Sequence, residues 1–368
     1  MNRPASTPCS PAVTPAPWAS NASSYAPPAP IAPITLKLDA NEGAAPAPWL
    51  GEVLAGLDPE TFRRYPRPRE FEAFLAARFG VDPSRVLVTA GGDEAIDRAC
   101  RATLGPGREL ILPVPTFEMF VRYAAVASAA VTTVDWPGGP FPTDAVISRL
   151  SDRTSMIAVV SPNNPTGAVI DAAGLERISS RALSRGALVL ADLAYTEFAD
   201  EDLTPLALTL PNVMVVRTLS KAWGLAGLRI GYALGPPDII AWLRAAAGPY
   251  SVTGPSLAIG RACLERGQDA MQAFVARSRL EVAELRSLLA SLGVTAAPSQ
   301  GNFVLARFPD ADAVRAALGL RGIAVRGFPK DPLLAGALRI TAPCDAAAFS
   351  RLAAALREIL APRPGATP

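Results

Sequence analysis

The stretch Thr218-Leu-Ser-Lys-Ala-Trp-Gly-Leu-Ala-Gly-Leu-Arg-Ile-Gly (218–231) is the most informative part of this chain. It follows an apolar run typical of a buried strand, and Lys221 comes just after the hydroxyl-bearing Thr218 and Ser220. An amine in a desolvated position loses its proton near neutral pH and can act as a nucleophile. The glycines allow the backbone to turn back, so that the cation of Arg229 can help the hydroxyl groups to hold a phosphate. A lone lysine would more often be a surface residue in a loop, but the whole stretch favours a reactive lysine beside an anion site.

Around this stretch, the sequence alternates short apolar runs with amphipathic segments. The apolar runs are almost continuously hydrophobic, which is typical of strands buried on both faces of a parallel sheet. Amphipathic segments at 93–104 and 172–185 predict helices between the strands. This alternation predicts an α/β fold with a large, doubly wound and mostly parallel sheet. The expected strands span residues 85–89, 109–112, 156–160, 187–191, 213–217 and 229–234.

After Gly235 the pattern changes, and we expect a smaller α+β domain joined to the first by a long amphipathic helix at 270–292. The further helices expected span 237–247, 255–266 and 346–360, and the strands span 302–308, 323–327 and 337–341. The expected organisation is a disordered Pro/Ala-rich tail (1–33), an N-terminal arm packing with the small domain (34–48), a large domain (49–268), a small domain (269–362) and a flexible end (363–368).

Composition limits the possible functions. The chain has 368 residues, of which 50% are hydrophobic, and a formal net charge of +2. The near balance of charges gives no reason to expect a nucleic-acid or membrane partner, and no apolar run is long enough to span a bilayer. The four cysteines are scattered without metal-type spacing, and no signal-peptide pattern precedes them, so we expect a cytoplasmic protein without a metal site.

The chain contains no histidine. Catalytic triads with histidine, zinc sites with histidine ligands and histidine-ligated haem are therefore excluded within one chain. Acid–base chemistry must rely on lysine, tyrosine, cysteine, carboxylates or a cofactor.

Three further motifs carry candidate site residues. Asp192 ends an apolar strand, three residues before Tyr195, and a buried carboxylate there needs a partner; alone, a helix cap would explain it better. The turn Ser161-Pro-Asn-Asn-Pro-Thr-Gly (161–167) follows another strand, and Asn-Pro turns are common in any case. The segment 90–96 sets two glycines before an acidic helical turn, and its exposed N–H groups suit a phosphate, although strand–helix connections often contain glycine.

Together these blocks, in this order, resemble the class I/II aminotransferases, which are fold-type I pyridoxal-phosphate enzymes. The resemblance covers nearly all of residues 34–360. It implies pyridoxal 5'-phosphate as a Schiff base on Lys221 and transfer of an amino group from an amino donor to a 2-oxo acid acceptor. It makes Lys221 the general acid/base, Asp192 the partner of the pyridine nitrogen and Tyr195 a donor to the phenolic oxygen. The other cofactor residues that it implies are Gly91, Gly92, Asp93, Phe117, Asn164, Thr218, Ser220 and Arg229, although Phe117 is equally well explained as a core residue.

Within this family, the segments 38–42 (LDANE), 64–66 (RYP) and 322–326 (GIAVR) resemble the histidinol-phosphate aminotransferase branch. That branch implies a homodimer in which Tyr65 reaches the neighbouring subunit's cofactor phosphate. Arg339 lies on an apolar strand and needs an anionic partner. The resemblance makes it, with Asn164, a substrate-binding residue, and a structural salt bridge is the less favoured alternative. Arg326 is the candidate for the substrate's distal anion. The LDANE block continues here as Gly43-Ala-Ala-Pro, without the branch's usual aromatic residue, so the natural substrate stays open.

The same motifs leave a decarboxylase open as an alternative and count against two other functions. A decarboxylase of the same fold, similar to threonine-phosphate decarboxylases, would share all the cofactor residues. A non-catalytic regulator that binds pyridoxal phosphate would carry a DNA-binding domain, and residues 1–33 show neither a helix-turn-helix pattern nor a basic face. A dinucleotide-binding enzyme would need a G-x-G-x-x-G after its first strand, which this chain does not have.

Overall fold

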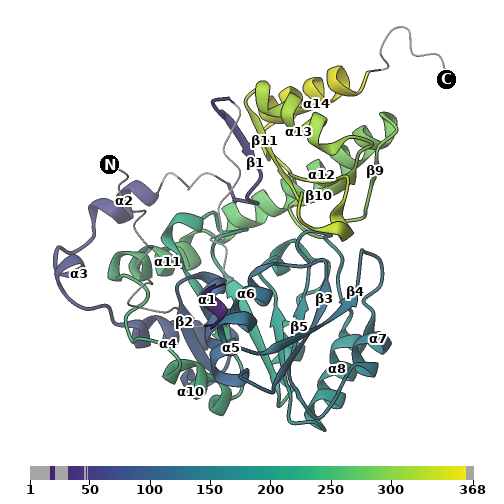
Figure 1. Ribbon diagram of the computed structural model, residues 1–368. Helices are drawn as coiled ribbons and strands as arrows, with labels where there is room; N and C mark the ends of the chain where they lie inside the picture. The colour runs from purple at the N-terminus through teal and green to yellow at the C-terminus, as the bar shows by residue number, and fades with distance from the viewer. Residues whose placement is uncertain (1–16, 21–31, 45–46, 48, 362–368) are drawn as a thin grey trace, which may run out of the picture.

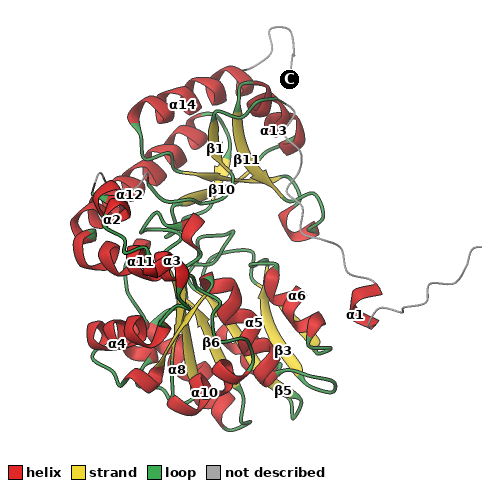
Figure 2. Cartoon of the chain, turned by 90° about the vertical axis from the view of Figure 1, so that its left-hand side faces the viewer, coloured by secondary structure: helices red, strands yellow, loops and turns green. Residues whose placement is uncertain are grey.

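The computed structural model describes residues 17–20, 32–44, 47 and 49–361. These residues form two sheets, each with helices packed against it, and the smaller sheet lies above the larger one in Figure 2. The fold is the α/β arrangement expected from the sequence. The proposed domain boundaries themselves stay a prediction.

The large sheet has seven strands in the order β2-β8-β7-β6-β5-β3-β4. All neighbours are parallel except β8, which runs antiparallel to both β2 and β7. Their bounds are β2 Val86–Thr89, β3 Glu109–Val114, β4 Ala130–Asp135, β5 Thr154–Val160, β6 Leu188–Asp192, β7 Val213–Thr218 and β8 Gly231–Leu234. The sequence patterns identified six of these strands and missed β4, one of the two edge strands.

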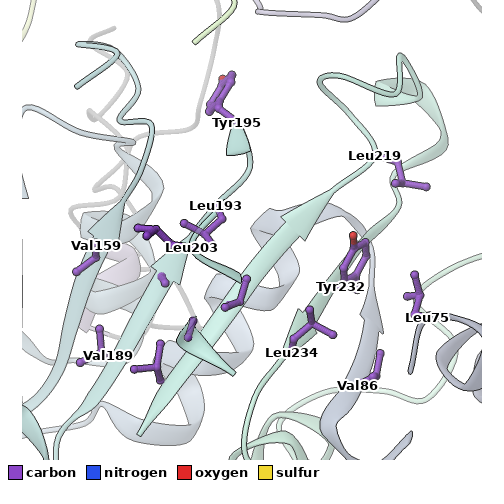
Figure 3. Close-up of a cluster of buried hydrophobic side chains, with 14 of the residues drawn as sticks. Leu75, Val86, Val159, Val189, Leu193, Tyr195, Leu203, Leu219, Tyr232 and Leu234 are labelled. Carbon is purple, nitrogen blue, oxygen red and sulfur yellow. The ribbon is translucent and has the colours of Figure 1, made fainter. Parts of the chain in front are cut away.

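The interior strands of the large sheet are buried on both faces. Along β6, Val189 packs into one hydrophobic cluster while its neighbour Leu190 packs into another on the opposite face. Figure 3 shows the first cluster, in which Val159 and Val189 lie near Leu193 and Leu203. Since successive side chains point to opposite faces, a strand covered on both sides must be apolar throughout. The helices around the sheet are α4 Pro68–Phe79, α5 Gly91–Thr103, α6 Met119–Val126, α7 Thr143–Ser148, α8 Ala172–Leu183, α9 Thr204–Ala207, α10 Pro237–Ala245 and α11 Gly254–Arg266.

The small sheet has five strands in the order β1-β11-β12-β10-β9. Strand β1, from the N-terminal arm, pairs in parallel with β11, and Leu36 lies opposite Ile323. The other pairs are antiparallel. The arm is thus part of the small sheet, although some 290 residues separate the paired strands in the sequence (323 − 36 = 287). The elements are β1 Leu36–Leu38, α12 Gln268–Ser291, β9 Thr295–Ala296, β10 Phe303–Arg307, α13 Ala311–Leu320, β11 Ile323–Gly327, β12 Ala337–Thr341 and α14 Ala346–Leu360.

Short helices complete the described chain. Within the tail expected to be disordered (1–33), the structure describes helix α1 (Pro17–Ser20), which lies against α6, and residues 32–33. The rest of that prediction, like the flexible end expected at 363–368, lies outside the described residues. Helices α2 (Leu50–Ala55) and α3 (Glu60–Arg63) lead from the arm into α4. No helix of the described residues is long and apolar enough to cross a membrane.

Candidate functional site

The carboxyl ends of three neighbouring parallel strands bring the predicted motifs together. Asp192 is the last residue of β6, where it pairs with Val160 of β5, and the Ser161 N–H donates to the Asp192 carbonyl at 2.9 Å. The next strand, β7, ends at Thr218, directly before the lysine segment. The turn at 161–167, the Asp192 segment and the Lys221 segment therefore meet at one edge of the sheet, where open α/β sheets bind their ligands.

Lys221 lies between this edge and the N-terminal arm. Its Nζ donates to the Ala40 carbonyl at 3.2 Å and lies 5.6 Å from the ring centroid of Tyr195. The arm backbone approaches the lysine segment closely, since a Cβ added to Gly43 would lie 2.0 Å from the Lys221 carbonyl oxygen. Only glycine fits at position 43, so the arm can lie directly over the lysine.

The Asp192 carboxyl group is buried, with 5% of the residue exposed. Burial raises the pKa of Asp192 to about 7; the charge of Asp93 adds to the rise, while the N–H of Ala194 and the charge of Lys221 oppose it. The Ala194 N–H donates to Oδ1 at 3.1 Å. A buried carboxyl group of this kind is best stabilised as an anion by a cationic N–H donor, which is what a protonated pyridine nitrogen offers.

An anion site is assembled where α5 begins. The Arg229 Nη2 donates to Asp93 Oδ2 at 3.0 Å, and a Cβ at Gly91 would lie 2.3 Å from the same nitrogen. Gly91 has φ +77°, and Arg229 itself adopts the left-handed region at φ +53°. Beside them, the Ser220 N–H donates to Thr218 Oγ1 at 3.1 Å. A helix start, a guanidinium and two hydroxyl groups therefore surround a position suited to a phosphate.

Arg339 joins the small sheet to this edge. Its Nη1 donates to Asn164 Oδ1 and its Nη2 donates to the Asp39 carbonyl, both at 2.5 Å. The residue is buried on β12, with 6% exposed. The side-chain oxygen of Asn164 accepts from Arg339. The NH₂ group of Asn164 therefore points away from Arg339, as it must if it is to donate to an oxygen of the cofactor.

Comparison with known proteins supports the same family. Residues 36–356 match the family described as aminotransferase class I and II. The chain is 36% identical over 344 residues to the histidinol-phosphate aminotransferase of Xylella fastidiosa (strain 9a5c), covering 89% of this chain and 90% of that protein. It is 38% identical over 320 residues to the same-named protein of Xanthomonas euvesicatoria pv. vesicatoria (strain 85-10), covering 83% and 85%.

The chain belongs to the class I and II aminotransferase family. It is a pyridoxal-phosphate-dependent aminotransferase, as the sequence motifs predicted. Its fold matches a structure of histidinol-phosphate aminotransferase from Sinorhizobium meliloti in complex with pyridoxal-5'-phosphate, with a TM-score of 0.82, 23% identity and 94% and 96% of the two chains covered. It also matches N-succinyldiaminopimelate aminotransferase from Mycobacterium tuberculosis, with a TM-score of 0.73, 26% identity and 87% and 93% covered.

The residues of this aminotransferase fit the cofactor. Asp192 offers a buried carboxyl group whose pKa is raised chiefly by burial and lowered by the charge of Lys221. Because Gly91 has no side chain, the Arg229 guanidinium can lie against the backbone at the start of α5, where exposed N–H groups suit a phosphate. Among the described residues, no group of three or more histidine, cysteine, aspartate or glutamate side chains could hold a metal ion.

Four further predicted residues have the following surroundings. Phe117 is partly buried and packs against the core, and its neighbour Thr116 donates to Asn163 Oδ1 at 2.7 Å, which ties its loop to the 161–167 turn. Arg326 Nη2 lies 3.7 Å from Glu118 Oε1, so the structure gives this cation an acidic neighbour. Tyr65 is 77% exposed and stacks on Tyr250 with ring centroids 4.6 Å apart; within the chain it does not join the residues around Lys221. Gly92, next to Gly91, lies in the first turn of α5.

One residue of the site had no role in the sequence reasoning. Asn41 is buried, with 1% exposed, and its Nδ2 donates to the Tyr195 hydroxyl oxygen at 2.9 Å. Asn41 belongs to the LDANE block that the sequence analysis singled out, but its partner Tyr195 lies 154 residues away along the chain. No local pattern could identify that contact.

Proposed function

We propose that this aminotransferase holds its cofactor through the Lys221 amine and that its substrates are an amine with an anionic group and a 2-oxo acid. The observation that carries the proposal is the convergence of Asp192, Lys221 and Arg229 at the carboxyl ends of the large sheet. These residues come from different segments, and each suits a different part of pyridoxal phosphate. Asp192 suits the ring nitrogen, Lys221 the aldehyde carbon and Arg229 the phosphate. Histidinol phosphate, with 2-oxoglutarate as acceptor, is the first substrate pair to test, because curated relatives at 36–38% identity carry that name.

When bound, pyridoxal phosphate supplies an electron-withdrawing ring that stabilises negative charge at the substrate's α-carbon. Asp192 keeps positive charge at the ring nitrogen. The Lys221 Nζ, which donates to the Ala40 carbonyl at 3.2 Å, is the amine that would take the proton from the substrate's α-carbon and return it. Arg229, Ser220, Thr218 and the start of α5 at Gly91, Gly92 and Asp93 hold the phosphate.

Five more side chains orient the reacting groups. Tyr195 and Asn164 donate hydrogen bonds to the cofactor's phenolic oxygen, while Phe117 covers one face of the ring. Arg339 binds the carboxylate of an amino-acid substrate, and Arg326 binds a distal anion. The planar guanidinium of arginine matches a carboxylate with two parallel hydrogen bonds, which lysine cannot reproduce.

The test is an assay of purified protein with histidinol phosphate or a panel of aromatic and acidic amino acids, 2-oxoglutarate and pyridoxal phosphate. Formation of glutamate is expected, and Lys221→Ala should lower its rate by at least about 10⁴-fold and remove the absorbance of lysine-bound cofactor. Release of carbon dioxide without glutamate would instead favour the decarboxylase. Full turnover by Lys221→Ala would refute the role of the lysine.

We also propose a homodimer in which Tyr65 reaches the neighbouring subunit's cofactor phosphate. Its exposed ring, stacked on Tyr250 at the surface, supports this arrangement. Sedimentation velocity should give twice the chain mass of 38.3 kDa. A monomer with full activity would contradict it. A cytoplasmic location stays a prediction.

A further inference from the structure

We propose that Asn41 is a positioning residue that fixes the direction of the Tyr195 hydroxyl proton, and that it does so through a one-way hydrogen-bond chain starting in the small sheet. The inference rests on the proposed role of Tyr195 as a donor to the cofactor's phenolic oxygen. It adds the reason why that hydroxyl group acts as a donor.

Asn41 links three parts of the chain. Its backbone N–H donates to Thr341 Oγ1 at 3.3 Å, and its carbonyl oxygen accepts from Asn302 Nδ2 at 3.3 Å. Its side-chain amide lies between Thr341 of β12 and Tyr195 of the large sheet. All four residues are buried, and none is more than 4% exposed. The contacts are therefore shielded from water, and each donor must find its partner inside the protein.

The hydrogen bonds of the Asn41 side chain run in one direction. Thr341 Oγ1 accepts the Asn41 N–H and donates its own proton to Asn41 Oδ1 at 2.8 Å. With the amide oxygen on Thr341, the NH₂ group of Asn41 donates to the Tyr195 hydroxyl oxygen, 2.9 Å away. The Tyr195 oxygen thus accepts a hydrogen bond and must use its single proton on another acceptor.

An accepted hydrogen bond also makes a hydroxyl group a stronger donor, because chained hydrogen bonds polarise one another. The Tyr195 ring also packs edge-to-face against Phe303, with the ring centroids 5.4 Å apart and an interplanar angle of 83°. Phe303 therefore helps to fix the position of the Tyr195 ring, while Asn41 sets the direction in which the Tyr195 hydroxyl proton points. A donor of this strength at the phenolic oxygen would favour the unprotonated form of the lysine–cofactor linkage.

The backbone of Asn41 supports the same role. It adopts the left-handed region, with φ +54°, which asparagine tolerates and most other residues do not. The variant Asn41→Gly keeps this conformation accessible and removes only the side-chain amide, so it isolates the hydrogen bond better than alanine would.

The experiment follows the absorbance of bound pyridoxal phosphate against pH in the wild type, Asn41→Gly, Tyr195→Phe and the double variant. The midpoint should rise by roughly half to one pH unit in Asn41→Gly, since one hydrogen bond of ordinary strength is lost. It should rise at least as far in Tyr195→Phe. In the double variant, the Asn41 substitution should add nothing, because it acts only through the missing hydroxyl group.

Thr341→Val gives a second measurement should Asn41→Gly fold poorly. It removes the hydroxyl group that orients the amide and should raise the midpoint in the same direction by a smaller amount. Thr341→Ser, which keeps the hydroxyl, should restore the wild-type value.

An unchanged midpoint in Asn41→Gly and Thr341→Val would overturn the proposal, as would a shift of equal size in the Tyr195→Phe background. Neither result would contradict the proposal that Lys221 holds the cofactor. A wild-type protein whose cofactor absorbance does not form at all would instead refute the proposed function, and this inference with it.

Discussion

The site has two walls that differ in origin. One wall is the edge of the large sheet, where residues 161–229 supply the lysine and the buried carboxyl group and, together with the start of α5 at Gly91, the anion site. The other wall is formed by the arm and β12, and its contacts join residues about 300 positions apart, as Asn41 and Thr341 do. The first wall offers the groups that a cofactor needs. The second offers the groups that orient them and bind substrate. We therefore expect substitutions in the first wall to impair cofactor binding or turnover, and substitutions in the second wall to impair mainly substrate binding.

The largest effect is expected from Asp192→Asn in the first wall. The variant keeps the size of the side chain and an acceptor for the Ala194 N–H but cannot carry charge. Losing one partner of a buried charge pair costs about 3 kcal/mol or more, so kcat should fall more than about 100-fold. Asp200→Asn, at a side chain that is 76% exposed, is the control and should stay within about twofold of wild type. Near-normal turnover of Asp192→Asn would contradict the role of the Asp192 charge in the reaction.

The same carboxyl group predicts a pH effect on the cofactor-free protein. Burial raises the pKa of Asp192 from its ordinary value of 3.8 to about 7, so at pH values between these two the folded protein binds a proton that the unfolded chain has released. The free energy of unfolding should therefore fall by a few kcal/mol as pH rises through this window. Asp192→Asn should lack this part of the pH dependence. Urea unfolding of both proteins at pH 5 and pH 8 measures it, and a wild type that gains stability relative to the variant would contradict it.

A smaller effect is expected in the second wall from Arg339→Lys. Lysine keeps the charge but loses the paired geometry toward a carboxylate, which should cost about 2 kcal/mol and raise the KM for carboxylate substrates roughly 30-fold. Bound cofactor should keep its absorbance. Arg307→Lys, on β10 of the same small sheet, is the control, since Arg307 is exposed and bonds only to the carbonyls of Ala335 and Leu333 among the contacts described. Loss of cofactor from Arg339→Lys would contradict the prediction that residues of the second wall bind substrate rather than cofactor.

The smallest effect concerns Gly91→Ala in the anion site. Alanine at φ +77° costs roughly 1 kcal/mol, and its Cβ would also press on Arg229. Gly107→Ala is a matched control, because Gly107 has φ +81° and a Cβ there meets nothing within 4 Å. Both variants should unfold more easily, but only Gly91→Ala should bind pyridoxal phosphate about 5- to 10-fold more weakly. Equal affinity of the two variants would mean that Gly91 is not part of the anion site.

The sequence predicted the first wall better than the second. The buried strands of the large sheet are apolar throughout, so their positions were correct to within two residues at most ends. Strand β4 was missed because only Val134 of its six residues is buried, so it lacks the continuous apolar run that marks the other strands, including β2 at the opposite edge. Strand β8 begins at Gly231 rather than Arg229, because Arg229 adopts a left-handed conformation that no strand contains.

The second wall depends on tertiary contacts. The sequence indicated an arm over 34–48 and an arginine on an apolar strand, and the structure joins them through the contact of Arg339 with the Asp39 carbonyl. The pairing of Asn41 with Tyr195 and Thr341 leaves no periodicity in the sequence, because each partner belongs to a different element. The roles given to the individual site residues stay predictions until variants are made.

The pairing of β1 with β11 bears on how the molecule is synthesised. A strand near the beginning of the chain can find its neighbour only after residue 327 has left the ribosome, so the arm must wait unpaired while the large sheet folds. The lysine segment is therefore made and packed before the strand that covers it is secured. Newly made protein should become able to retain its cofactor late, in a single step, when the last strands join the two distant ends of the chain.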